Sequence, residues 1–234
     1  MAGLRNNKKM KFYAHRGASA DFPEHTMAAY RGAIEQGALG FECDIRITKD
    51  EVPVLWHDAN MKKEAKNSAI IANSTYAQVK SIYPALMTLN ELLDLAIENK
   101  KSLALETKHP VPTGNRVEEL VIAELQRRKD AIKKSGINIA IMSFSWFATQ
   151  RNIRAGFESV YLFAEPLLIN LNTAGVVGPA LQIIKNNPDF VKQQKNKGRR
   201  VFVWTVNDPI DVKLCADAGV DVIMSDNPAQ ARKA

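Results

Sequence analysis

LGFECDIRITKDEVPVLWHD, residues 39–58, decides the fold of this 234-residue chain. The stretch holds two runs of strand-forming residues, Leu39 to Ile47 and Val52 to Trp56, separated only by the four residues Thr48 to Glu51. A parallel pair of strands needs a crossover of a dozen or more residues, so the two runs are predicted to form an antiparallel hairpin.

Short strand-like runs alternate with helical patterns along the rest of the chain, which is typical of parallel strands joined by crossover helices. Nine strands are expected, at residues 12–14, 39–47, 52–56, 103–105, 139–143, 160–163, 175–177, 201–206 and 222–224. If the run 52–56 folds back over its partner, eight strands remain. The prediction is a single-domain (β/α)8 TIM barrel over residues 1–234 with a hairpin at strand 2, preceded by a flexible N-terminus at residues 1–11.

Helical patterns lie between the strands, and helices are expected at residues 26–36, 89–99, 116–134, 146–155, 180–195 and 209–218. Thr88, with Glu91 three residues later, predicts a capping box at the start of the second of these. Residues 59–84 have the least regular pattern, so a lid or a substrate-facing loop is expected there.

Composition favours a cytoplasmic protein with no stable membrane insertion. Apolar residues make up 46% of the chain, yet no apolar run approaches the roughly 20 residues that span a bilayer. Residues 1–11 are polar and basic, with no apolar stretch behind them typical of a signal peptide. Cys43 and Cys215 lie far apart in the sequence, and we expect two unpaired core thiols.

The net charge of +7 raises the alternative of a barrel that binds nucleic acid and has no catalytic activity. Lysine and arginine are scattered along the chain without interleaved aromatic residues, which favours solvated helix faces, and no nucleic-acid partner is expected. A positive field would also attract an anionic small-molecule substrate.

Glu42 and Asp44 are two residues apart on a predicted strand, so they share one face while Cys43 points to the other. In a partly desolvated site their repulsion would be several kcal/mol at an effective dielectric constant of about 20, and a divalent cation would relieve it. Carboxylate oxygens favour Mg²⁺, Ca²⁺ or Mn²⁺ over zinc. The alternative is a surface strand with solvated acids.

Glu106 follows the predicted strand 103–105 and shares a face with Lys108. Glu106 can complete a set of three carboxylate ligands, while Lys108 can reach a phosphoryl oxygen as a point charge. The alternative is an exposed ion pair at a strand end.

His15 and His57 each follow an apolar strand, where the catalytic face of a barrel is expected. Imidazole, with a pKa near 6.5, exchanges protons at neutral pH, although a histidine at a strand end also serves as a packed or capping residue. Arg16 offers a fork for phosphate oxygens, with an ion pair to Glu24 or Glu42 as its alternative.

Three other residues have a weaker sequence signal for a functional role. His25 and His109 do not end strands, and we leave them out of the reaction. Trp204 lies on the predicted strand 201–206 and can present its ring to an alcohol moiety, with core packing as the alternative. Together, carboxylates, cations and histidines of this kind favour metal-assisted phosphodiester cleavage, which needs charge neutralisation, a base and an acid.

The chain resembles the glycerophosphodiester phosphodiesterase family in short motifs spread over nearly its whole length. They include His15-Arg16-Gly17, Pro23-Glu24-His25-Thr26, Glu42-Cys43-Asp44-Ile45, Leu55-Trp56-His57-Asp58, Leu105-Glu106-Thr107-Lys108 and Trp204-Thr205-Val206-Asn207. The resemblance implies metal-dependent hydrolysis of glycerophosphodiesters to glycerol 3-phosphate and an alcohol. It also implies one divalent cation on Glu42, Asp44 and Glu106, acid and base roles for His15 and His57, and phosphate binding by Arg16 and Lys108.

The sequence departs from the family pattern in three places. His25 stands where the family usually has asparagine, Glu51 where it has glycine, and Met61-Lys62-Lys63-Glu64 where an Arg-Thr-Thr run is usual. The last departure borders the site and leaves substrate preference open. An inserted cap domain has no room in the thirty residues between His57 and Thr88.

Lysophospholipase D or sphingomyelinase D activity on the same barrel is the alternative enzymatic reading, and an apolar groove rimmed by Tyr76, Ile82 and Tyr83 would favour it. The sequence leaves open the head group, the physiological metal, which histidine is the acid, whether water or a substrate hydroxyl attacks, and whether the protein forms a homodimer.

Overall fold

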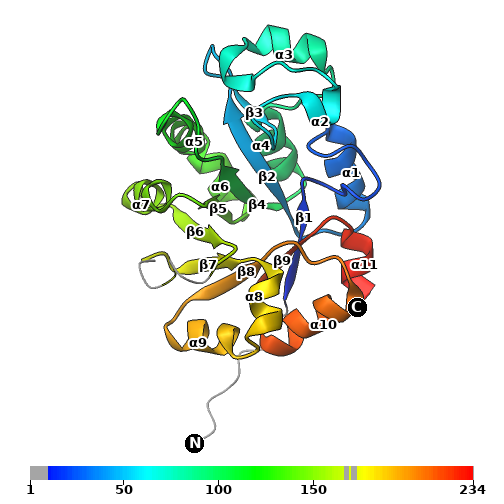
Figure 1. Ribbon diagram of the computed structural model, residues 1–234, viewed down its shortest axis with the longest axis vertical. Helices are drawn as coiled ribbons and strands as arrows, with labels where there is room; N and C mark the ends of the chain where they lie inside the picture. Colours follow the sequence, from blue (N-terminus) through cyan, green and yellow to red (C-terminus); the bar gives the residue numbers. More distant parts are fainter. Residues whose placement is uncertain (1–9, 166–168, 170–172, 234) are drawn as a thin grey trace, which may run out of the picture.

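The computed structural model describes residues 10–165, 169 and 173–233. Eight parallel strands close into a barrel that is surrounded by helices (Figure 1). The order around the barrel is β1-β9-β8-β7-β6-β5-β4-β2, and the pairing of β1 with β2 closes it. The ninth strand, β3, pairs antiparallel with β2 outside the ring. The predicted (β/α)8 barrel with a hairpin at strand 2 is confirmed.

The strand bounds agree closely with the expected runs. The strands are β1 (Lys11–His15), β2 (Gly40–Ile47), β3 (Pro53–Leu55), β4 (Ser102–Thr107), β5 (Ile139–Ser143), β6 (Glu158–Phe163), β7 (Val176–Pro179), β8 (Arg200–Val203) and β9 (Val222–Ser225). The helices are α1 (Met27–Glu35), α2 (Lys62–Ala65), the 3₁₀ helix η1 (Ile71–Asn73), α3 (Tyr76–Ile82), α4 (Leu89–Glu98), α5 (Arg116–Arg127), α6 (Lys129–Ser135), α7 (Trp146–Arg154), α8 (Leu181–Asn186), α9 (Phe190–Asn196), α10 (Pro209–Ala218) and α11 (Pro228–Lys233).

The β2–β3 hairpin turns at Thr48, whose backbone N–H donates to the carbonyl of Val52 at 3.1 Å and whose hydroxyl accepts from the Val52 N–H at 3.0 Å. The pairing continues past β3, because the N–H of Trp56 donates to the carbonyl of Asp44 at 3.0 Å. The hairpin therefore returns the chain to the middle of β2 and places His57 next to Asp44 in space.

The two faces of the barrel strands have opposite character. On β2, Phe41, Cys43 and Ile45 are buried in the apolar cluster under the helices, whereas Glu42 and Asp44 point into the barrel. Apolar side chains fill most of the interior, namely Tyr13, Ala104, Ala140, Met142, Val160, Leu162, Val176, Phe202, Val222 and Met224. Cys43 and Cys215 are buried and unpaired, as expected.

Two predicted helices are interrupted. The expected helix 116–134 is interrupted at Arg128, which has φ −98° and ψ 9°, and forms α5 and α6. The expected helix 180–195 is broken into α8 and α9 because Pro188 disfavours a helical conformation at Asn187, which has φ −140° and ψ 88°.

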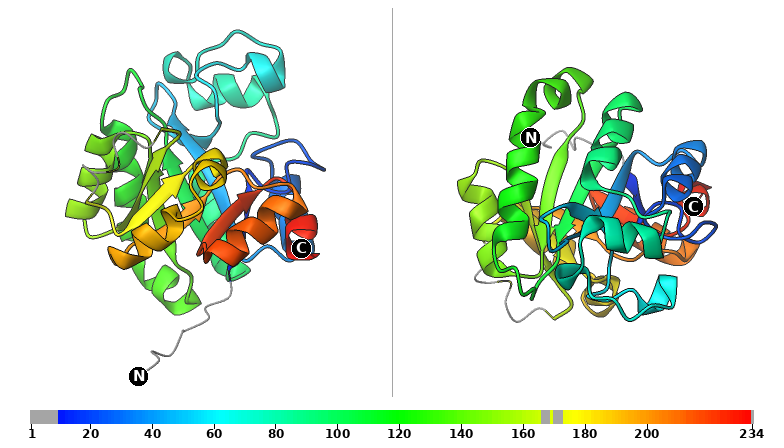
Figure 2. Two further views of the ribbon diagram at one scale, coloured as in Figure 1. Left: turned by 60° about the horizontal axis from the view of Figure 1, so that its bottom comes forward. Right: turned by 90° about the horizontal axis from the view of Figure 1, so that it is seen from above.

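Residues 59–84, where a lid or a substrate-facing loop is predicted, form short helices. The segment contains α2, η1 and α3 and, together with β3, encloses its own apolar cluster of Val54, Trp56, Met61, Ile71, Val79 and Leu86. In Figure 1 and in the left view of Figure 2 the segment stands apart from the ring of helices, beyond β3. Tyr76, Ile82 and Tyr83 pack against this cluster.

Of the expected flexible terminus, residues 1–9 lie outside the described residues, whereas Met10 is buried and Lys11 begins β1. Within the part of the chain that the structure describes, no helix combines the length and the apolar character needed to cross a bilayer.

The capping box of α4 is confirmed and can be tested. The backbone N–H of Glu91 donates to Thr88 Oγ1 at 3.3 Å, and the N–H of Thr88 donates to Glu91 Oε2 at 2.7 Å. Thr88→Ala should lower the free energy of unfolding by about 1 kcal/mol because a helix N–H loses its acceptor. Urea denaturation measures the change, with Thr88→Ser, which keeps the hydroxyl, as the control. An alanine variant as stable as the parent would contradict this account.

Candidate active site

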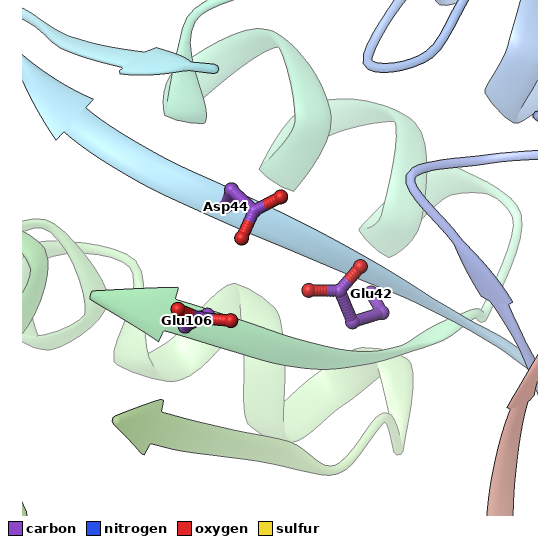
Figure 3. A group of neighbouring side chains, drawn as sticks. All are labelled: Glu42, Asp44 and Glu106. Carbon is purple, nitrogen blue, oxygen red and sulfur yellow. The ribbon is translucent and has the colours of Figure 1, made fainter. Parts of the chain in front are cut away.

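The centre of the site is a cluster of three carboxylates inside the barrel mouth. Glu42 and Asp44 project from β2, and Glu106 projects from the neighbouring strand β4, where it lies opposite Asp44 in the register (Figure 3). Each residue offers one oxygen, and these three oxygens lie within 4.8 Å of one another. All three side chains are buried, so the alternative of a solvated surface strand does not hold.

Burial and mutual repulsion perturb these carboxyl groups. Burial, followed by the charge of Asp44, raises the pKa of Glu42 well above its usual value and that of Glu106 to about 7. Burial also acts to raise the pKa of Asp44, but the hydrogen bond from His25 and the charge of Lys108 outweigh it and hold that pKa well below 3.8. Burial and repulsion therefore favour the protonated forms of Glu42 and Glu106 while Asp44 stays ionised, and full ionisation of all three groups would be unfavourable.

Two cationic side chains reach the cluster. Lys108 Nζ lies 2.7 Å from Glu106 Oε1 and 3.1 Å from Asp44 Oδ1. Nε of Arg16 lies 3.0 Å from Asp44 Oδ2, and its Nη1 lies 3.2 Å from both oxygens of Glu24, which bears out the alternative of an Arg16–Glu24 pair. The alternative of an exposed ion pair between Glu106 and Lys108 does not hold, because both side chains are largely buried.

The turn after β1 aims Arg16 at the cluster. Arg16 and Gly17 both have positive φ values, 58° and 85°. A Cβ on Gly17 would lie 2.6 Å from the Cβ of Ala29 on α1, so glycine is required for this close approach. The backbone N–H of Arg16 donates to Glu42 Oε2 at 3.1 Å, and this bond ties the turn to the carboxylate cluster.

Both predicted histidines line the same small cavity. His15 ends β1, with Nε2 3.9 Å from Glu42 Oε2 and Nδ1 2.6 Å from Asp226 Oδ1. His57 follows β3, with Nδ1 2.7 Å from Asp58 Oδ1. Burial lowers the pKa of His57 from 6.5, and the charge of Asp44 partly opposes that effect.

The cavity has a polar side and an aromatic side. Its volume is about 90 Å³, and its lining includes Glu42, Glu106, Lys108, Phe144 and Trp204. The indole N–H of Trp204 donates to the carbonyl of Gly178 at 2.8 Å, and its ring packs edge-on against Phe144 at 5.3 Å between centroids. A second, more open cavity of about 470 Å³ adjoins it at His15 and Arg16. Tyr76, Ile82 and Tyr83 line neither cavity.

Sequence reasoning missed Asp226, which lies just after β9 and holds His15. Asp226 accepts a hydrogen bond from Asn207 Nδ2 at 2.7 Å, and its Oδ1 lies 2.9 Å from the hydroxyl of Ser19. Burial acts to raise the pKa of Asp226, but the bond and charge of His15 outweigh it and lower that pKa to about 2. A polar residue directly after an apolar strand was the available signal, the same one that identified His15.

The two histidines left out of the reaction lie in different surroundings. His25 is buried against Asp44, with Nε2 3.0 Å from Oδ2. His109 Nε2 lies 2.6 Å from Oε1 of Glu118, which also pairs with Arg151, and it lines neither of the two cavities. Setting His25 aside thus overlooked a direct contact with the carboxylate cluster.

Comparison with known proteins agrees with this geometry. Residues 15–230 match the glycerophosphoryl diester phosphodiesterase family. The chain belongs to this family. Among its relatives, the probable glycerophosphodiester phosphodiesterase 1 of Mycobacterium tuberculosis is 33% identical over 94% of this chain and 90% of its own. A glycerophosphodiester phosphodiesterase from Caldanaerobacter subterraneus is 27% identical over 92% and 93% of the two chains. The prediction of an enzyme of this family is confirmed.

Solved structures show the same fold. The glycerophosphodiester phosphodiesterase of Thermotoga maritima superposes with a TM-score of 0.82 at 23% identity, covering 96% of this chain and 98% of that one. A phosphodiesterase from Oleispira antarctica, solved in complex with the product sn-glycerol-3-phosphate, gives 0.79 at 21% identity, covering 95% of each chain.

The raised pKa values predict how stability depends on pH and on cations. Glu106 titrates near pH 7 in the folded protein and near 4.5 when unfolded, so the folded form binds the extra proton between these values. In the presence of a chelator, the stabilisation that Glu106 contributes should therefore fall as pH rises from about 4.5 to 7, seen as the difference in melting temperature between the parent and Glu106→Gln.

At pH 8 a saturating divalent cation should raise the melting temperature, by about 2–4 °C for each kcal/mol of binding free energy. Differential scanning calorimetry of the parent and of Glu106→Gln, which should weaken both effects, measures this. A melting temperature equal in chelator and in Mg²⁺ or Ca²⁺ would count against a cation site.

Proposed function

We propose that this member of the family hydrolyses glycerophosphodiesters to glycerol 3-phosphate and an alcohol, with one divalent cation on Glu42, Asp44 and Glu106. The observation that carries the proposal is the buried three-carboxylate cluster, two members of which line a cavity of about 90 Å³ together with two histidines and two cationic side chains. A neutral substrate would gain little from so many charges. An anionic diester and a cation together would balance them.

The residues present fit a cation that prefers oxygen ligands, and Mg²⁺, Ca²⁺ and Mn²⁺ are the proposed ions. Three carboxyl groups converge, and burial raises the pKa of two of them. A dication can replace the protons on these groups and neutralise the carboxylates, whose mutual repulsion would otherwise be unfavourable. Such an ion, when bound, polarises a phosphoryl oxygen as a Lewis acid.

Arg16 and Lys108 are the proposed phosphate-binding residues. Each now pairs with Asp44, and with Glu24 or Glu106 respectively, at 2.7–3.2 Å. With the carboxylates neutralised by a bound cation, these side chains would be able to donate to phosphoryl oxygens. The guanidinium can form two parallel hydrogen bonds, whereas the ammonium acts as a point charge.

His15 is proposed as the base and His57 as the acid. Asp226 accepts from Nδ1–H of His15, which leaves Nε2 unprotonated and able to take a proton from the nucleophile, either water or a hydroxyl of the substrate's glycerol. Asp58 lies against Nδ1 of His57 and acts to favour the protonated form that an acid needs, against the burial that lowers the pKa of this imidazole. His57 would then protonate the departing alcohol.

Trp204 is proposed to pack its ring against the alcohol moiety. The ring lines the cavity while the indole N–H is already bonded to Gly178, so an apolar face is left for the ligand.

The solved structure of the Oleispira antarctica phosphodiesterase with sn-glycerol-3-phosphate supports a small-molecule substrate of this class. Cytoplasmic location and a homodimer stay predictions.

The role of His57 can be tested by removing its imidazole. His57→Ala should lower the rate of glycerol 3-phosphate release by about 10²–10⁴-fold, because the alkoxide would leave without a proton. Release from glycerophosphocholine, measured by a coupled assay in saturating Mg²⁺ or Ca²⁺, gives the rate. Circular dichroism checks folding, which the half-exposed side chain should not disturb.

Lys213→Ala, on the exposed face of α10, is the control and should keep the parental rate. Turnover by His57→Ala within a few-fold of the parent would reject the proposed acid. Activity of the parent that survives thorough chelation would reject the cation.

A further inference from the structure

His25 occupies an unusual backbone position that locks it beside the carboxylate cluster. It precedes Thr26, the N-cap of α1, and has a φ of 60°, a region in which histidine is one of the few enriched residues. Its backbone N–H donates to the carbonyl of Arg16 at 3.0 Å, and only 3% of its surface is exposed. The imidazole is therefore fixed by the same turn that aims Arg16.

Both ring nitrogens have partners. Nε2 lies 3.0 Å from Asp44 Oδ2, and Nδ1 lies 3.0 Å from the hydroxyl oxygen of Tyr30. Tyr30 is completely buried on α1, and its hydroxyl also lies 3.2 Å from the carbonyl of Glu42. Because an ionised carboxylate only accepts hydrogen bonds, the proton between His25 and Asp44 belongs to Nε2.

We propose that His25 is a positioning residue that holds the Asp44 carboxylate in the orientation needed to bind the divalent cation. The inference rests on the cation site of the proposed function. A carboxylate oxygen has two lone pairs, so one can accept from Nε2 while the other faces an ion. Partners that hydrogen-bond to ligating groups in this way typically change metal affinity by about 10–100-fold when they are removed.

The two cationic side chains that contact Asp44 have a different role. Arg16 and Lys108 line the cavity and would turn to phosphate when a substrate enters. His25 does not line the cavity, so the substrate leaves its bond to Asp44 intact. His25 can thus hold the carboxylate throughout the reaction, without exchanging protons with the substrate.

The hydrogen bond from Nε2 to Asp44 exists because this chain has a histidine at position 25. Asparagine, which is usual at this position in the pattern that the sequence resembles, ends at the atom equivalent to Nδ1 and does not extend to the place of Nε2. Glutamine is longer, and its amide nitrogen reaches approximately where Nε2 lies. The two ring nitrogens can therefore be tested separately by substitution.

Metal affinity, measured without substrate, is the direct test. Isothermal titration calorimetry with Mg²⁺ and with Ca²⁺ should give a dissociation constant about 10–100-fold higher for His25→Ala than for the parent. His25→Gln, which restores a donor near Nε2, should recover most of the affinity. Raising the cation concentration should also restore most of the turnover of His25→Ala, because the groups that act on the substrate are unchanged.

His109→Ala is the matched control, because it also removes a histidine, here a partly buried one, from a carboxylate. Glu118 keeps its pair with Arg151 in that variant, and the cation affinity should equal that of the parent. Tyr30→Phe removes only the hydroxyl that holds Nδ1, and it provides a result even if circular dichroism shows His25→Ala to be unfolded. It should weaken cation binding by less than His25→Ala does.

Three results would contradict the inference or the cation site on which it rests. Parental affinity in His25→Ala, or in Tyr30→Phe if the alanine variant is unfolded, would overturn the inference. Affinity in His25→Gln as low as in His25→Ala would also overturn it, since packing and not the Nε2 donor would then be responsible. Failure of the parent itself to bind Mg²⁺ or Ca²⁺ would instead refute the proposed cation site.

Discussion

The repulsion among three buried carboxylates is the constraint on which the rest of the site depends. Glu42, Asp44 and Glu106 come from adjacent parallel strands whose register sets Asp44 opposite Glu106, so the side chains cannot separate without breaking the sheet. The strands themselves are stabilised by apolar packing on their outer faces, where Cys43 and Leu105 are buried under the helices. The fold thus holds in place a charge arrangement that is unfavourable by itself.

The neighbouring elements place cationic side chains and a histidine next to the carboxylates. The turn after β1 brings Arg16 to Asp44, Lys108 directly follows β4 and reaches the same carboxylate, and the hairpin returns His57 to the edge of the cluster. Without a cation, two of the carboxyl groups have raised pKa values, and the side chains of Arg16 and Lys108 are engaged with carboxylates. The side chains of Arg16 and Lys108 are therefore available to a phosphate only when a metal ion neutralises the carboxylates.

Sequence alone predicted the parts of the site that depend on strand geometry. The four residues between two strand-like runs required a hairpin, and the period of two placed Glu42 with Asp44 and Glu106 with Lys108. Asp226 and His25 were missed because each follows or precedes an element at a position whose contacts are made only by the folded chain. The position of Asp226 directly after β9 marks it as a candidate, but its contact with His15, 211 residues away in the sequence, is made only when the barrel closes.

The fold shows the same division between local and long-range information. The helical period of residues 116–134 runs on through Arg128, so the break between α5 and α6 has no signal in the pattern. Helices α2 and α3 are too short to produce a period, and their stability comes from packing around Trp56 and Met61. Thr88 and Glu91 are close in sequence, and their capping box was predicted correctly.

The account is tested most directly by locating an ion. A crystal soaked in Mn²⁺, with anomalous diffraction data, should show one strong peak within about 2.0–2.6 Å of oxygens from Glu42, Asp44 and Glu106. His25 should remain on Asp44 in that crystal. A well-ordered barrel mouth with no anomalous peak between these carboxylates, or a peak held by other residues, would contradict the central claim.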